Sequence, residues 1–127
     1  MIPKCKQVNI YSAEEQIIGK WTNGKPLYRK VIETTTPTVT TDGTDVWKQV
    51  IMDNIDFGYM VNIFTVSDNS TTKNTRNIFW QGGTNRIRSN FLINKSNNKG
   101  VLEIVSNDSQ WNNLSVIAIV EYTKTTD

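Results

Sequence analysis

The sequence predicts an all-β fold, namely an antiparallel β-sandwich of jelly-roll-like type with about eight strands. Short runs rich in Val, Ile, Thr and aromatic residues recur along the chain, and turn residues separate them at fairly regular spacing. Thr and Asn are abundant, which suits strands and turns respectively, whereas Ala and Leu are scarce. No stretch shows convincing 3.6-residue periodicity of an amphipathic helix, which argues against a helical bundle.

The first two strands are predicted at residues 15–22 and 25–34, and they form a hairpin. Asn23-Gly24 separates them, and Asn-Gly is the strongest short hairpin signal because both central residues of the favoured turn take φ > 0. The Thr-rich residues 35–44 follow, interrupted by Pro37. They predict an extended connection or an edge strand.

Six further strands are predicted in the rest of the chain, separated by polar or glycine-containing turns. A second hairpin is expected where Gly82-Gly83 joins two of them. The intervening segments 53–58, 68–74, 95–99 and 107–113 are expected to be turns or polar loops. The six strands are predicted at 46–52, 59–67, 75–81, 84–94, 101–106 and 114–123.

The whole chain, residues 1–127, is expected to form a single domain with residues 1–14 as a lead-in segment, because 127 residues fit one hydrophobic core. The formal net charge of +2 is weak and evenly spread, so nucleic acid is not an expected partner. Cys5 is the only cysteine, which excludes an internal disulfide. The longest apolar run, residues 116–120, is far shorter than the roughly 20 residues of a membrane span, so no membrane insertion is expected.

The chain contains no histidine, and this absence narrows the possible chemistry. Ser-His-Asp and Cys-His catalysis are excluded in their usual forms, and a zinc site would lack its common ligands. The sequence predicts a protein that is not an enzyme and that has no cofactor and no metal, with a calcium site at Asp53 and Asp56 or around Asp68 as the alternative for the metal. A polysaccharide depolymerase stays open as an alternative, and it would need two carboxylates facing each other across a groove.

Four tryptophans are candidates for either core packing or ligand binding. Trp21 and Trp47 lie in predicted strands, so both are expected in the core. Trp80 lies next to a glycine turn near Arg86 and Arg88, and Trp111 lies in a polar loop. An exposed aromatic ring beside such polar groups would suit a sugar, which stacks on the ring and hydrogen-bonds its neighbours. The candidate ligand-binding residues are Trp80, Arg86, Arg88 and Trp111, and the alternative for each tryptophan is that it anchors a loop to the core.

The last predicted strand is apolar on both faces. Val116, Ala118 and Val120 alternate with Ile117 and Ile119. One face can pack on the partner sheet. The other face is covered either within the same chain or by a neighbouring chain, and in the second case the candidate interface residues are Ile117, Ile119 and Tyr122.

Three segments of the chain carry a resemblance to a known group of proteins. They are residues 11–30 (YSAEEQIIGKWTNGKPLYRK), the ending 121–127 (EYTKTTD), and residues 93–96 (INKS) with the turn at Gly100. These segments resemble recurrent sequences in the carboxy-terminal domains of tail fibre or receptor-binding proteins of phages and prophages of Gram-positive hosts. The middle of the chain, residues 35–90, carries no such resemblance.

The resemblance implies a β-sandwich at the tip or along the shaft of a tail appendage, commonly a homotrimer. It implies localisation in the virion after synthesis in the bacterial cytoplasm, with other phage tail components as partners. The expected function is binding of a host cell-surface glycan or wall polymer, either a cell-wall polysaccharide or an anionic polymer similar to teichoic acid. The alternative is a purely structural module that trimerises or attaches part of the appendage.

Overall fold

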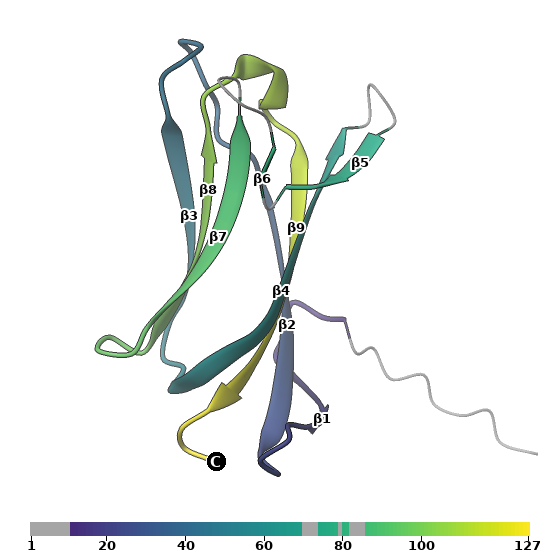
Figure 1. Ribbon diagram of the computed structural model, residues 1–127, viewed down its shortest axis with the longest axis vertical. Coiled ribbons are helices and arrows are strands. Elements are labelled where there is room, and N and C mark those ends of the chain that lie inside the picture. The colour runs from purple at the N-terminus through teal and green to yellow at the C-terminus, as the bar shows by residue number, and fades with distance from the viewer. Residues whose placement is uncertain (1–10, 70–73, 79, 82–85) are drawn as a thin grey trace, which may run out of the picture.

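The computed structural model describes residues 11–69, 74–78, 80–81 and 86–127, and these form two antiparallel sheets packed face to face (Figure 1). The predicted all-β sandwich is confirmed. The five-stranded sheet has the order β1-β2-β9-β4-β5, and the four-stranded sheet has the order β3-β8-β7-β6. The elements are β1 (Gln16–Lys20), β2 (Pro26–Thr35), β3 (Val46–Met52), β4 (Phe57–Asn69), β5 (Asn74–Asn77), β6 (Trp80–Gln81), β7 (Ile87–Asn94), β8 (Lys99–Ser106), the 3-10 helix η1 (Ser109–Trp111) and β9 (Ser115–Lys124).

The hydrophobic core lies between the two sheets and follows the two-residue alternation of the strands. In β9 the inward positions are Val116, Ala118, Val120 and Tyr122, all of them buried. The strands that pair with β9 and those of the facing sheet contribute the rest of the core, which includes Tyr28, Ile32, Met52, Phe57, Ile78, Ile87, Phe91, Leu102 and Ile104. The inner face of the predicted last strand is therefore a core face.

The first hairpin forms where it was predicted, but its turn differs. Gly24 has a φ of 83°, whereas Asn23 is not among the residues with positive φ. The turn is closed by two hydrogen bonds, from Gly24 N to the carbonyl oxygen of Trp21 (2.8 Å) and from Trp21 N to the carbonyl oxygen of Lys25 (2.8 Å). The Asn23 side chain also accepts a hydrogen bond from Lys25 N at 3.0 Å. The expected turn with two positive φ values is wrong, because the Asn23 side chain stabilises a loop in which only the glycine needs that conformation.

The single strand predicted at 75–81 is in fact two strands in different sheets. β5 pairs with β4 in the five-stranded sheet, and β6 pairs with β7 in the four-stranded sheet. Ile78 lies at the crossing between them, fully buried, and its N–H donates to the carbonyl oxygen of Thr65 at 3.2 Å. Burial of Ile78 between the sheets explains why the chain changes sheet there. The β6–β7 pairing confirms the second hairpin, whose glycine turn lies outside the described residues.

Several predicted loops contain residues that anchor them to the core. Phe57 lies in the predicted turn 53–58, yet it begins β4 and is buried. The connection after β2 runs past η1, where Asn112 accepts from Val39 N (2.8 Å) and donates to the Val39 carbonyl oxygen (3.0 Å). Thr36 donates to the carbonyl oxygen of Trp111. In the part of the chain that the structure describes, no helix is long and apolar enough to cross a membrane.

Candidate functional site

The outer face of the four-stranded sheet carries side chains in rows that run across β3, β8 and β7. Strand register sets these rows, because cross-strand partners lie side by side on the same face. We call the following residues the Trp47 face. Its rows are Trp47, Val105 and Arg88; then Gln49, Glu103 and Asn90; and then Ile51, Val101 and Leu92. In Figure 1 this face lies on the side of β3, β8 and β7 turned away from β9 and β2.

Trp47 is the prominent residue of this face, with 53% of its side chain exposed. The Arg88 guanidinium lies 5.6 Å from the centroid of the Trp47 ring, which is a cation–π distance. Val105 stands between them in the register and points outward, yet it is only 2% exposed. Val105 is therefore covered within this row, while about half of the Trp47 side chain remains accessible to a ligand.

The two rows of the Trp47 face that follow the tryptophan row carry hydrogen-bonding side chains and apolar side chains, respectively. Gln49 Nε2 donates to Glu103 Oε2 at 3.3 Å, and Asn90 beside Glu103 is exposed. The next row is apolar, with Ile51 and Leu92 each about half exposed. The face thus offers an aromatic ring, a row of donors and acceptors, and an apolar row, which is the combination that holds a ligand with both apolar and polar sides.

One of the predicted ligand-binding residues, Arg88, lies in the tryptophan row. The Arg88 guanidinium lies over the Trp47 ring, and the backbone of Trp80 in β6 pairs with that of Arg88. The side chain of Trp80 lies outside the described side chains. Arg86 lies one row above Arg88 and bonds to Asp45 at 3.2 Å, while its N–H donates to Asn107 Oδ1 at 2.7 Å. The sequence thus placed Arg86 and Arg88 near a common surface.

The prediction that Trp111 binds a ligand is wrong. Trp111 ends η1 and belongs to the core cluster, with only 9% of its side chain exposed. The helical turn begins at Asp108, whose side chain accepts from Gln110 N at 3.0 Å. This cap turns the polar loop so that its one large apolar side chain faces inward. The alternative, in which this tryptophan anchors the loop, is the correct one.

The prediction that Trp47 lies in the core is also wrong, and it kept Trp47 out of the candidate ligand-binding residues. The inward positions of β3 are Val50 and Met52, which contact the core, and Lys48 shares their side of the strand. Because β3 is an edge strand, Lys48 can extend past the core, and its Nζ donates to Thr35 Oγ1 at 2.8 Å. The sequence showed that side chains alternate between the two faces of this strand, but it did not show that Trp47 lies on the outward face.

A second candidate surface is the outer face of the five-stranded sheet, where the interface residues were predicted. Ile117 is 42% exposed there and Ile119 is partly buried, beside Glu33 and Val31 of β2. Tyr122, however, is 0% exposed, because it alternates onto the core side of β9. Its assignment to the interface is therefore corrected.

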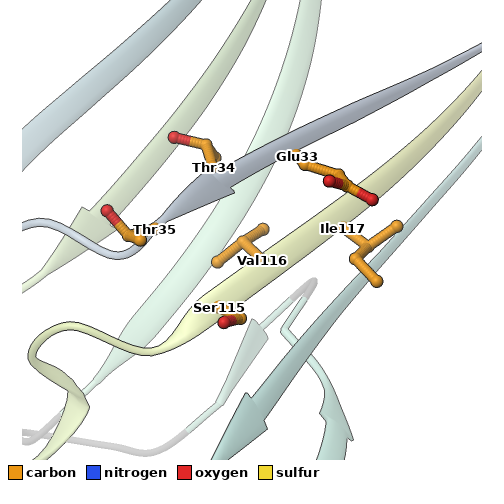
Figure 2. A pocket seen from close by; sticks show the side chains of 6 residues that line it. All are labelled: Glu33, Thr34, Thr35, Ser115, Val116 and Ile117. Atoms are coloured by element: carbon orange, nitrogen blue, oxygen red, sulfur yellow. The ribbon is translucent and has the colours of Figure 1, made fainter. Parts of the chain in front are cut away.

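Two open grooves border this second surface. One groove, with a volume of about 450 Å³, lies at the end of β2 and the start of β9. Figure 2 shows Glu33 beside Ile117 in this groove. The residues that line it are Glu33, Thr34, Thr35, Ser115, Val116 and Ile117. The other has a volume of about 360 Å³ and is bounded by the lead-in residues; it is lined by Tyr11, Ser12, Ala13, Val31, Glu33, Ile117 and Ile119.

Comparisons with known proteins provide no relative for this chain. No protein-family model matches it, and no match was found among curated proteins or solved structures. Within the described residues, no group of three or more Cys, Asp or Glu side chains is placed to hold a metal ion.

Proposed function

We propose that this chain is a non-enzymatic binding domain of a phage tail appendage and that it holds a host cell-surface glycan or wall polymer on the Trp47 face. The observation that carries the proposal is the half-exposed Trp47 ring beside Arg88, directly above the Gln49–Glu103 pair. A pyranose ring has apolar faces and a polar rim, and this face has matching groups. The resemblance of the chain's two ends to tail proteins supports the biological setting.

The geometry also suits weak binding that is strengthened by multiple copies. The Trp47 face is part of an open sheet, so a single ligand unit would bury little area and bind weakly. Tail appendages of the kind that the chain resembles are commonly homotrimers and work beside other tail components in the virion. Several weak sites on one particle would hold a cell firmly, because each bound site raises the local concentration of the next.

The test is retention on purified cell walls from a panel of Gram-positive bacteria, compared between the native chain and Trp47→Ala. We expect the native chain to pellet with some of these walls and Trp47→Ala to lose about tenfold or more in affinity. Ile17→Ala is the matched control, since Ile17 is an exposed apolar residue of the other sheet. Equal retention of the native chain and Trp47→Ala would remove the Trp47 face from the proposal.

A purely structural module is the second candidate, and the exposed Ile117 on the five-stranded sheet favours it. In this case the outer face of that sheet would contact neighbouring copies in a trimer. Light scattering coupled to size exclusion should then give the mass of three chains, and Ile117→Asp should reduce it to one. A native chain that is monomeric at all concentrations would count against this candidate and leave the glycan proposal intact.

A further inference from the structure

We infer that the Trp47 face selects an uncharged glycan, built of neutral hexopyranose units, and not an anionic wall polymer. This inference rests on the proposed function and names the ligand class of the same site. It follows from the balance of charges on the face, from the groups that surround the tryptophan, and from the spacing of the rows.

Two basic side chains that flank the Trp47 face each lie near a carboxylate. Arg86 bonds to Asp45 at 3.2 Å, and Lys99, which follows the apolar row along β8, lies 3.6 Å from Asp53. Arg88 lies over Trp47, in the row next to Glu103. Within the three rows of the Trp47 face, Arg88 is the one cation and Glu103 is the one carboxylate, so these rows carry no net formal charge.

An anionic polymer would need a different surface. Phosphate and carboxylate groups are recognised by Lys or Arg side chains whose donors are free to bind them. Here Glu103 would repel such a ligand from the centre of the face. Lys48, the one basic residue of β3, turns to the other side of that strand and bonds to Thr35. Charge complementarity therefore disfavours a polyanion and permits a neutral ligand.

The polar row supplies the groups that sugar hydroxyls need. The Glu103 carboxylate accepts one hydrogen bond from Gln49 and has further acceptor positions. The Asn90 amide beside it can both donate and accept. Adjacent rows lie about 7 Å apart along the strands, so a sugar ring stacked on Trp47 brings its rim within reach of these long side chains.

The experiment is a glycan array that carries uncharged oligosaccharides together with phosphate- and uronate-bearing ones, probed with the full chain at low and at high salt. The variants are Trp47→Ala, Glu103→Gln, and Ile17→Ala as the control, each checked for folding by its melting temperature. We expect binding to a set of uncharged glycans that changes less than about twofold between 0.05 and 0.5 M salt, since screening weakens only charge–charge attraction. We expect both face variants to lose about tenfold or more in affinity.

The other outcomes separate the two proposals. Binding only to anionic glycans, weakened by salt and lost in Trp47→Ala, would overturn this inference and leave the proposed function standing. Binding that all variants retain would overturn the site assignment. No binding to any glycan, together with a Trp47-dependent increase in mass by light scattering, would show that a second copy of the chain occupies the face and would overturn both proposals.

Discussion

Tyr28 and Tyr122 stack on each other across the β2–β9 pair, with ring centroids 5.8 Å apart and an angle of 18° between the ring planes. Each hydroxyl donates a hydrogen bond to a carboxylate from a different end of the described chain, Tyr28 to Asp127 (2.6 Å) and Tyr122 to Glu15. Lys124 also bonds to Glu15 at 2.5 Å. The tyrosine pair therefore ties Glu15, which precedes β1, and Asp127 to the core.

This arrangement makes stability depend on pH in the alkaline range. The hydrogen bond to Asp127, followed by burial, raises the pKa of Tyr28 from 10.0 to about 12, and burial, followed by the hydrogen bond to Glu15, raises the pKa of Tyr122. A raised pKa means that the folded state favours the neutral phenol. The stabilisation is therefore fully present below pH 10 and is lost as pH rises from 10 through about 12.

The measurement is the free energy of unfolding from urea titrations between pH 8 and pH 12. We expect a decline that begins near pH 10 in the native chain and is shallower in Tyr28→Phe, because that variant lacks one of the two phenols. A Tyr28→Phe curve parallel to the native curve over the whole range would show that the Tyr28 hydroxyl does not contribute to the pH dependence.

The ion pair between Arg29 and Glu121 on the outer face of the five-stranded sheet should contribute more to stability than an exposed pair. The two side chains are 2.9 Å apart and only 14% and 13% exposed. The Tyr11 ring lies 4.4 Å from the Arg29 guanidinium, and Asn62 donates to Glu121 at 3.0 Å. Loss of one partner leaves a largely buried charge unpaired, so Arg29→Met should reduce the free energy of unfolding by about 2–4 kcal/mol.

The matched control for this pair is Arg86→Met. The pair of Arg86 with Asp45 has a similar geometry, at 3.2 Å, but its side chains are about one third exposed. Its loss should cost less than about 1 kcal/mol. Urea unfolding of the two variants in parallel tests the difference, and equal losses would show that burial does not strengthen the Arg29 pair.

Gly100 is required by the close packing of two phenylalanines, not by its backbone angles. A Cβ atom at this position would lie 2.5 Å from Phe91 Cζ and 2.8 Å from Phe57 Cζ. The two rings meet edge to face with centroids 6.2 Å apart, so neither can move without disturbing the other. Gly100→Ala should therefore lower the free energy of unfolding by about 1–3 kcal/mol, as measured by urea unfolding.

The sequence predicted the fold well because strand alternation and turn residues are local signals. The hairpin at Asn23, the strand Val46–Met52 and the apolar inner face of β9 followed from them directly. The crossing at Ile78 could not be predicted, because the residues on either side are equally suited to a strand in either sheet.

The site was predicted only in part, because the choice of the outward face depends on tertiary packing. In β3 the sequence offers Trp47 and Ile51 on one side and Val50 on the other, and hydrophobicity favours burying the tryptophan. The structure exposes it, since Val50 and Met52 meet the core and Lys48 can extend past the sheet edge. Arg88 was identified as a candidate because it lies in a strand with alternating basic residues.

The two tryptophans that the sequence misassigned should respond to substitution in opposite ways. Trp111 packs into the core, and its carbonyl oxygen accepts a hydrogen bond from Thr36. Trp111→Ala would leave a cavity and should lower the free energy of unfolding by about 3–5 kcal/mol. Trp47 lies on the surface over Val105, so Trp47→Ala should cost about 1 kcal/mol or less.

For binding to cell walls, in contrast to stability, substitution of Trp47 should have a larger effect than substitution of Trp111. The measurement is made at a temperature where both variants are folded. Trp47→Ala should lose the ligand while remaining stable, whereas Trp111→Phe, which keeps an aromatic ring in the core, should bind as the native chain does. Both readouts are needed, because a destabilised variant also loses binding by unfolding. If Trp111→Phe lost binding while its stability was unchanged, Trp111 would act on the ligand site and its purely structural role would be refuted.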